Sequence, residues 1–329
     1  MPHNFAIVGC GNVSARHAAA IQQVGTLVAV CDTETMRAQE LARSYGCKVF
    51  SNVEELLSNS EAAIISVCSP SGFHAPHAIQ ALSAGRHVLC EKPMAITSRS
   101  AKEMIRAAKH ADRRLLVVKQ NRYNPPVQLL KQLISEGKLG DIHSFQVNCF
   151  WNRNNLYYQN SAWRGKQDVD GGTLFTQFSH FVDLLYWLFG PLREARGWRG
   201  NFSHRESVEF EDTGVANLLM ENGTIGSLHY TLNAHQHNLE GSIIVFGSKG
   251  TIKVGGVYLN RVEYFSIDGE QTDQWLSKIP ETLGNPHLKV YHELVKTLDD
   301  PQHPFVDAEE ACRSVEMIEE IYRNSPMVT

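Results

Sequence analysis

The chain has 329 residues, enough for two domains, and an ordinary composition with 43% hydrophobic and 20% charged residues. Its net charge of −4 gives no electrostatic reason to expect nucleic acid or an acidic membrane as partner. The seven cysteines are scattered without metal-ligand spacing, which favours buried, reduced thiols and predicts no metal site. No signal peptide is recognisable, and the most apolar stretch, HFVDLLYWLFG, is too short to span a bilayer, so we expect a cytoplasmic protein.

The first third of the chain alternates short apolar strands with helical patterns. The strand FAIV (5–8) runs into the turn GCGNVS, and the helix that follows precedes the strand LVAV (27–30). The alternation continues with apolar strands at 62–68, 87–90 and 115–119. Repeated strands and helices with short connections predict a doubly wound parallel sheet, with ligands beyond the carboxyl ends of its strands.

The turn after the first strand has the chemistry of a dinucleotide site. Gly9 allows the tight turn, Gly11 lets the backbone approach a pyrophosphate, and Ser14 replaces the third glycine of GxGxxG. Asp32, at the end of the second strand, is placed to accept hydrogen bonds from a ribose 2′-hydroxyl. Because no arginine follows it to bind a 2′-phosphate, the sequence favours NAD over NADP.

GCGN, Asp32, SPSGFH and EKP occur in an order that resembles the Gfo/Idh/MocA oxidoreductase family. The resemblance implies an NAD-binding Rossmann domain over 1–122 and an α+β domain over 123–329 with a large open, mostly antiparallel sheet. That sheet would join the chains of a homodimer or homotetramer. The last helix, 307–323, is a candidate to pack back on the first domain.

Turn signals in the second half support such a sheet independently of the resemblance. Asn222–Gly223 lies between apolar runs, and a second hairpin is predicted across 248–250. Near the end, Asp307 and Glu310 form a predicted capping box for the last helix.

The resemblance also assigns catalytic roles. Lys92 of HVLCEKPMA would bind the reacting hydroxyl and stabilise alkoxide character, and Pro93 would fix the strand exit, with a cis peptide as one option. His180 lies on a predicted single helix, in a polar stripe with Thr173, Thr176 and Gln177, and suits removal of the hydroxyl proton. Many family members have Asp or Asn where Thr176 stands, which leaves the division of acid–base work open.

Further residues are expected at the two ligands. Those expected at the cofactor are Gly9, Gly11, Asn12, Val13, Asp32, Ser69, Pro70, His74, Glu91, Lys92 and Gln120. Those expected at the substrate are Asn121, Arg122, Arg153, Trp163, Arg164, Thr176 and Gln177. Guanidinium groups suit a diphosphate and a carboxylate, and Tyr157, Tyr158 and Trp163 suit stacking on uracil or sugar. For each of these residues the alternative is an aromatic in the core or an arginine at a solvated rim.

Segments such as VVKQNRYNPP and FWNRNNLYYQNSAWRGKQDVDGG resemble the UDP-N-acetyl-2-amino-2-deoxyglucuronate 3-dehydrogenases within that family. This resemblance implies NAD-dependent oxidation of the carbon-3 hydroxyl of UDP-N-acetyl-glucosaminuronate (UDP-GlcNAcA) to the 3-keto sugar, in surface-polysaccharide (lipopolysaccharide) biosynthesis. The alternatives are the same chemistry on a free sugar or polyol such as inositol, and a non-catalytic NAD-binding sensor or scaffold. How NADH is reoxidised stays open.

Overall fold

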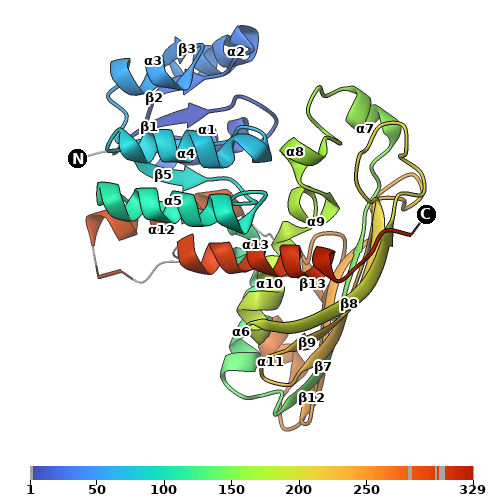
Figure 1. Ribbon diagram of the computed structural model, residues 1–329. Coiled ribbons are helices and arrows are strands. Elements are labelled where there is room, and N and C mark those ends of the chain that lie inside the picture. The colour runs from blue at the N-terminus through green and yellow to red at the C-terminus, as the bar shows by residue number, and fades with distance from the viewer. Residues whose placement is uncertain (1–2, 281–283, 301, 304–307, 329) are drawn as a thin grey trace. The chain divides into compact units, whose positions relative to one another are not determined.

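The computed structural model of the chain describes residues 3–280, 284–300, 302–303 and 308–328. They form two compact units, one of Met1–Gln120 with Asn285–Val315 and one of Asn121–Gly284 with Glu316–Thr329 (Figure 1). We expected the second domain to run unbroken from residue 123, but Asn285–Val315 groups with the first unit. The reason is helix α12 (Pro286–Asp299), whose buried residues pack against α1 (Ser14–Val24).

The first unit is built on a parallel sheet whose strand order is β3-β2-β1-β4-β5-β6. This is the order of a dinucleotide-binding fold, in which the crevice opens where β1 and β4 diverge. The predicted doubly wound sheet is therefore confirmed, and only the three-residue edge strand β3 was missed. The strands are β1 (His3–Val8), β2 (Gly25–Cys31), β3 (Lys48–Phe50), β4 (Ile64–Val67), β5 (His87–Cys90) and β6 (Leu115–Val117).

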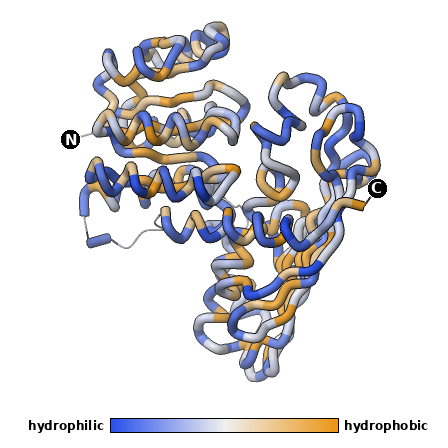
Figure 2. The backbone as a smooth tube through the Cα atoms, viewed as in Figure 1, coloured by the Kyte–Doolittle hydropathy of each residue, from blue (hydrophilic) through white to orange (hydrophobic). Residues whose placement is uncertain are grey.

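The strands of this sheet are buried because hydrophobic side chains occupy both of their faces. In Figure 2 the strands of the first unit are mainly orange, whereas its helices alternate between hydrophobic and hydrophilic turns. Its helical elements are α1, α2 (Thr35–Tyr45), α3 (Val53–Asn59), η1 (Ser71–Phe73), α4 (His74–Ser83), α5 (Ser98–Ala111), α12 and the first half of α13 (Ala308–Arg323). Thr97 caps α5 as a side-chain acceptor for the Ser100 N–H. The capping box predicted from Asp307 lies outside the described residues.

The second unit is built on a mostly antiparallel sheet of order β13-β12-β11-β7-β10-β9-β8, in which only β7 and β10 run parallel. Both predicted hairpins are present, β9–β10 across Asn222–Gly223 and β11–β12 across 248–249. The strands are β7 (Ile142–Phe150), β8 (Leu192–Gly200), β9 (Thr213–Met220), β10 (Ile225–Thr231), β11 (Glu240–Gly247), β12 (Gly250–Gly255) and β13 (Arg261–Ile267). The predicted fold class is confirmed for this unit as well.

The helical pattern after Gly171–Gly172 forms two helices, not the single one that we predicted. α9 ends at Thr176 and α10 begins at Ser179, because the chain turns at Phe178 (φ −115°, ψ 10°). His180 therefore lies in the first turn of α10. The helical elements of this unit are η2 (Gln120–Tyr123), α6 (Pro125–Ser135), α7 (Asn155–Gln159), α8 (Gln167–Asp170), α9 (Thr173–Thr176), α10 (Ser179–Phe189), α11 (Thr272–Leu276) and the end of α13.

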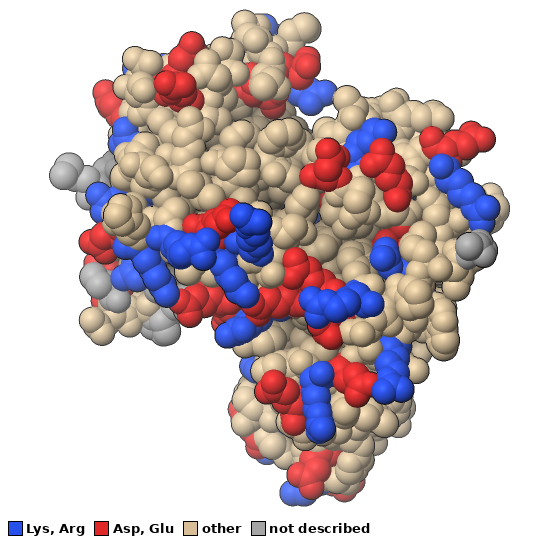
Figure 3. Space-filling view, in the orientation of Figure 1, with Lys and Arg blue, Asp and Glu red and all other residues tan. Residues whose placement is uncertain are grey.

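The surface carries charges of both signs. On the face shown in Figure 3, acidic and basic side chains are interspersed, and one group of basic residues lies over α5. Six of the seven cysteines are buried and all are free thiols, as expected for a chain without disulfides. Among the helices of the described residues, none combines the length and apolar character needed to cross a membrane.

Candidate active site

The glycine turn of the first unit has the shape that a dinucleotide requires. Gly9 has φ +94°, and a Cβ there would lie 2.5 Å from the backbone nitrogen of Ser69 at the end of β4. A Cβ on Gly11 would meet nothing within 4 Å, so its exposed backbone leaves room for a pyrophosphate. Ser14, in place of the third glycine, donates its hydroxyl hydrogen to the Gly11 carbonyl at 2.7 Å and starts α1. Asn12 and Val13 complete the turn.

Asp32 ties this turn to the end of β2. Its carboxylate accepts hydrogen bonds from the backbone N–H of Cys10 (2.6 Å) and of Glu34 (2.8 Å). Burial, followed by the neighbouring Asp32, raises the pKa of the Cys10 thiol to about 12, so the thiol stays protonated. Each carboxylate oxygen can accept more than one hydrogen bond, so Asp32 can still bind two ribose hydroxyls. The residues of the turn thus fit NAD.

The predicted cofactor residues that follow β4 are Ser69, Pro70 and His74, and their contacts differ. Ser69 and Pro70 lie at the carboxyl end of the sheet, and the Ser69 hydroxyl contacts His77 Nδ1 at 2.9 Å. His74 is buried, and its ring nitrogens lie 2.7 Å from the Pro93 carbonyl oxygen and 2.8 Å from that of Ser69. Burial lowers the pKa of His74. With both nitrogens engaged, His74 links two turns of the unit and is not oriented toward a ligand.

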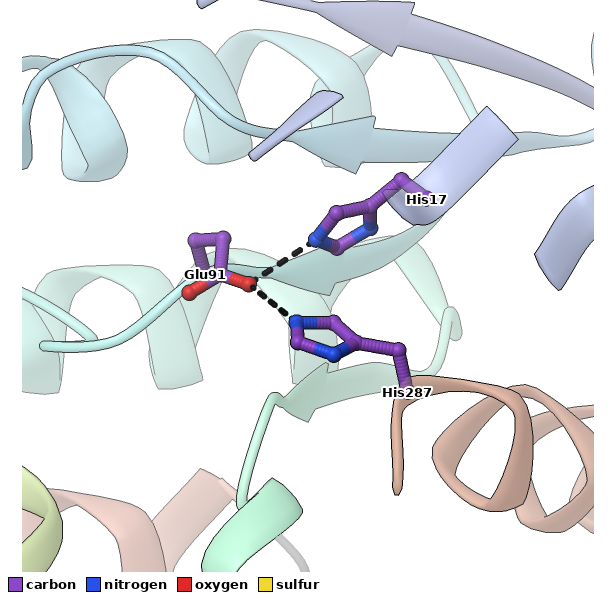
Figure 4. A group of neighbouring side chains, drawn as sticks. All are labelled: His17, Glu91 and His287. Carbon is purple, nitrogen blue, oxygen red and sulfur yellow. Dashed lines mark hydrogen bonds and ion pairs between the residues drawn. The ribbon is translucent and has the colours of Figure 1, made fainter. Parts of the chain in front are cut away.

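Glu91 is buried and faces the interior of the first unit. It is 5% exposed, and its Oε2 accepts the backbone N–H of Lys92 at 3.0 Å. Its Oε1 lies 2.8 Å from His17 Nε2 and 3.5 Å from His287 Nε2 (Figure 4). Burial alone would raise the pKa of Glu91, but the hydrogen bond from His17 and the nearby imidazole of His287 hold that pKa well below its ordinary value. Lys92 itself is partly exposed, and the Lys92–Pro93 peptide is cis, as the sequence allowed.

The second unit gathers predicted substrate residues around one arginine. Arg153 Nε donates to Gln177 Oε1 at 2.8 Å, and Gln177 Nε2 donates to the Tyr157 hydroxyl at 2.9 Å. The Arg153 guanidinium also lies 5.1 Å from the ring centroids of both Trp151 and Tyr157. These contacts hold a partly exposed cation in one geometry, which is how an anion site is preorganised.

A second arginine extends this group. The Arg164 guanidinium stacks 4.2 Å from the Tyr157 ring centroid and lies 5.5 Å from that of Trp163. Lys166, by contrast, is exposed and pairs with Glu209 at 3.0 Å. We therefore define the arginine group as Arg153, Arg164, Tyr157, Trp163 and Gln177.

Arg122 does not belong to the arginine group. Its Nε and Nη2 each donate to a carboxylate oxygen of Asp183 at 2.7 Å, and both side chains are 4% exposed. The guanidinium also lies 5.3 Å from the Trp187 ring centroid. This pairing neutralises a buried carboxylate, and the substrate contact expected of Arg122 stays a prediction. Gln120 and Asn121 precede it in η2, both partly exposed.

The start of the segment that carries His180 is held by a buried carboxylate that the sequence did not identify. Glu211 is fully buried, and it accepts hydrogen bonds from the Tyr322 hydroxyl (2.5 Å), Arg199 (3.2 Å) and the Thr173 N–H (3.2 Å). Burial raises its pKa, and the bonds from Tyr322 and Arg199 only partly offset that effect. Thr173 therefore has a structural role. Thr176, which is partly exposed, and His180, which is 7% exposed, follow it along the segment.

His204 is a further residue that sequence reasoning missed. Its Nδ1 lies 3.0 Å from Asp212 Oδ2, and its Nε2 lies 2.6 Å from the backbone carbonyl of Arg153. This dyad supports the main chain of the arginine group from behind. The only sequence signal was the EDTG stretch, because Asp212 follows a second acid before an expected strand.

Comparisons with known proteins agree with both units. Residues 3–119 match the model of an oxidoreductase family with an NAD-binding Rossmann fold, GFO_IDH_MocA, and residues 127–253 match the GFO/IDH/MocA C-terminal domain. The chain is similar to the WlbA dehydrogenase from Bordetella pertussis in complex with NADH and UDP-GlcNAcA (TM-score 0.93, 37% identity, 98% of this chain and 95% of that chain). It is also similar to the Chromobacterium violaceum WlbA dehydrogenase in complex with the same two ligands (TM-score 0.93, 33% identity, 98% and 94%).

A further relative is named for a different activity. D-glucoside 3-dehydrogenase from Escherichia coli strain K12 is 37% identical over 244 residues, which are 70% of this chain and 67% of that protein.

Proposed function

Because the chain belongs to the Gfo/Idh/MocA family of NAD-binding oxidoreductases, we propose that it oxidises the carbon-3 hydroxyl of UDP-GlcNAcA to the 3-keto sugar. The chain is an NAD-dependent sugar oxidoreductase, and the proposal concerns its substrate. Both WlbA neighbours are complexes with UDP-GlcNAcA, which supports this choice. Surface-polysaccharide assembly as the destination of the product is part of the same proposal.

The observation that carries the proposal is the arginine group. UDP-GlcNAcA has a diphosphate and a carboxylate, and Arg153 and Arg164 offer two fixed guanidinium groups backed by aromatic rings. Trp163 and Tyr157 add flat apolar surfaces of the kind on which a uracil or a sugar ring stacks. A neutral free sugar has no use for two such cations.

In the proposed reaction, the Gly9–Val13 turn would hold NAD, which would supply the hydride acceptor for carbon 3. Lys92 would hold the hydroxyl oxygen and stabilise the negative charge that develops there. His180 would take the hydroxyl proton, since an imidazole near neutral pH is suited to accept it. Thr176 can donate or accept a hydrogen bond but cannot share charge with the imidazole, so we assign the proton transfer to His180 and the charge stabilisation to Lys92.

The second candidate is a neutral sugar oxidised at the same carbon. It is favoured by the D-glucoside 3-dehydrogenase relative, whose name specifies carbon-3 oxidation of a glycoside without a nucleotide. The difference between the candidates is therefore the anionic part of the substrate.

The test is NADH formation, followed by absorbance, with UDP-GlcNAcA, with UDP-N-acetyl-glucosamine and with a simple glucoside. The second substrate differs from the first only in having a neutral hydroxymethyl group in place of the carboxylate. We expect turnover of UDP-GlcNAcA, and we expect Arg153→Met to raise its KM about 10- to 100-fold, the value of a lost charge-assisted hydrogen bond of roughly 1.5–3 kcal/mol. Arg196→Met, an exposed arginine of β8 that pairs with Glu194, is the matched control. Turnover of the glucoside with a lower KM than UDP-GlcNAcA would transfer the proposal to the second candidate.

Assembly through the open sheet is the remaining part of the proposal. Large apolar side chains on β8, β9, β10, β11 and β13 are 41–61% exposed, and the strand register places them on one face: Trp198, Val215, Ile225, Phe246 and Tyr264. A second copy of the chain would cover this face. Light scattering should give a dimer or tetramer for the wild type and a smaller species for Trp198→Glu, whereas a monomeric wild type would refute it.

A further inference from the structure

A chain of buried polar side chains runs through the core of the first unit to the turn that carries Lys92. The Ser66 hydroxyl on β4 lies 2.7 Å from the Tyr291 hydroxyl on α12, which lies 2.8 Å from His17 Nδ1 on α1. His17 Nε2 then lies 2.8 Å from Glu91 Oε1 at the end of β5. Ser66, Tyr291 and His17 are fully buried. Such a chain links four elements of the unit, β4, α12, α1 and the end of β5, through buried side chains.

Every group along this chain has a partner that it can bond. The Glu91 carboxylate can only accept, so His17 donates to it from Nε2. The Tyr291 hydroxyl lies between His17 Nδ1 and the Ser66 hydroxyl, and a hydroxyl can donate to one neighbour while it accepts from the other. A satisfied buried network of this kind is rigid, because breaking any bond leaves a buried group unpaired.

Glu91 transfers that rigidity to the catalytic turn. Its Oε1 faces His17 and His287, and its Oε2 accepts the Lys92 backbone N–H at 3.0 Å (Figure 4). His287 lies in the first turn of α12, and its ring packs edge-on against that of His17 at 5.3 Å between centroids. The carboxylate is therefore held on one side by two helices and holds the main chain of Lys92 on the other.

We propose that His17 and His287 are positioning residues for the reaction, acting through Glu91 to hold Lys92. This inference rests on the proposed function, in which Lys92 contacts the reacting hydroxyl. His17 lies in the first turn of α1, directly after the turn from Gly9 to Val13 that would bind the cofactor phosphates. The same helix thus connects the cofactor turn with Glu91, so both are set by one rigid element.

His17, Glu91 and His287 are also residue types that bind metal ions. Their two imidazoles and one carboxylate place their ligand atoms within 4.8 Å of one another. Metal–ligand bonds of about 2.0–2.1 Å in a tetrahedral site keep ligand atoms roughly 3.3 Å apart. The His17–Glu91 separation of 2.8 Å is instead that of a hydrogen bond. We therefore assign the cluster to hydrogen bonding, and the metal content of the protein tests that assignment.

The experiment uses His17→Ala, His17→Gln and His287→Ala in the full-length protein, with His110→Ala, an exposed histidine at the end of α5, as the control. Glutamine can place its amide N–H where His17 has Nε2, so it restores the bond to Glu91. We expect kcat with UDP-GlcNAcA to fall at least 10-fold in both alanine variants, with KM for NAD within 3-fold of wild type. His17→Gln should recover most of kcat, and His110→Ala should match wild type.

A second readout needs no substrate. Amide hydrogen exchange of the peptide spanning residues 88–97 should accelerate in the alanine variants and not in His17→Gln. Unchanged kcat and unchanged exchange would overturn the proposal, as would a loss confined to KM for NAD. If the wild type turns over no sugar, the proposed function fails while the exchange result still decides the positioning role. Stoichiometric zinc whose removal mimics the alanine variants would replace the hydrogen-bond assignment with a metal site.

Discussion

Replacing Arg122 distinguishes a structural role from the substrate contact that its sequence context suggested. Arg122 and Asp183 form a two-point ion pair with both bonds at 2.7 Å and with 4% exposure of each side chain. Removing one partner of a buried pair leaves a charge without compensation and costs about 3–5 kcal/mol. We therefore expect Arg122→Met to lower the free energy of unfolding of the second unit by about that amount.

The partner substitution sharpens this prediction. In the double variant with Asp183→Leu the buried charge is gone, and replacing a buried ion pair by apolar residues of similar volume is often neutral. The double variant should therefore regain most of the lost stability. Arg196→Met, on the surface, should change stability by no more than about 0.5 kcal/mol.

Tryptophan fluorescence is a selective assay for this measurement. All five tryptophans of the chain lie between residues 151 and 275, within the second unit, so a urea titration followed by their emission reports on that unit alone. A loss below about 1 kcal/mol for Arg122→Met, together with a KM for UDP-GlcNAcA raised 10-fold or more, would refute the structural role and support Arg122 as a substrate ligand.

Three more predictions follow from single contacts. Asp32→Ala should weaken NAD binding about 10-fold or more in calorimetric titration, by loss of charge-assisted hydrogen bonds to the ribose; an unchanged affinity would contradict the cofactor assignment. The folded-state pKa of Glu91 is depressed, so its ionised form contributes stability above pH 4.5 that is lost as the pH falls through the folded-state pKa. Tm should therefore drop more steeply below pH 4.5 in the wild type than in Glu91→Gln. Parallel Tm curves for the two proteins would contradict this role of Glu91. Gly172→Ala should have a lower free energy of unfolding than Gly223→Ala. Both glycines have positive φ, but only at Gly172 would a Cβ lie 2.5 Å from the Tyr322 hydroxyl. Equal losses of unfolding free energy in a urea titration would show that backbone strain alone matters.

Features set by neighbouring residues could be predicted from the sequence. β5 was expected at 87–90 and occupies His87–Cys90, because a short, mostly apolar run between a glycine turn and a proline leaves little choice of conformation. The β9–β10 hairpin was expected at Asn222–Gly223 because Asn-Gly favours a tight turn, and Gly223 has the positive φ (+88°) that glycine adopts readily. The cofactor turn belongs to the same group, since its glycines act through local backbone geometry.

The break between α9 and α10 could not be read from local patterns. Residues 173–189 are apolar at helical spacing, so the sequence alone favours one continuous helix. In the structure, Gln177 is bonded to Arg153 and Tyr157, and Thr173 is bonded to Glu211. These partners are 20 to 38 residues away along the chain, so a pattern within 173–189 carries no information about them.

The sequence could not show which charged residues have buried partners, and the same reason explains why His17 was not among the predicted site residues. An arginine or glutamate in a motif offers the same hydrogen bonds to a ligand and to a buried partner, and the partner is found only by folding. Arg122 meets Asp183 61 residues away, and His17 meets Glu91 74 residues away and Tyr291 274 residues away. A buried charge must be paired, so once such a partner exists it takes precedence over a solvent-exposed ligand. The strongest candidates for substrate are therefore the charged residues whose partners are aromatic faces or amides, as at Arg153, because these orient the guanidinium and leave its charge for an anion.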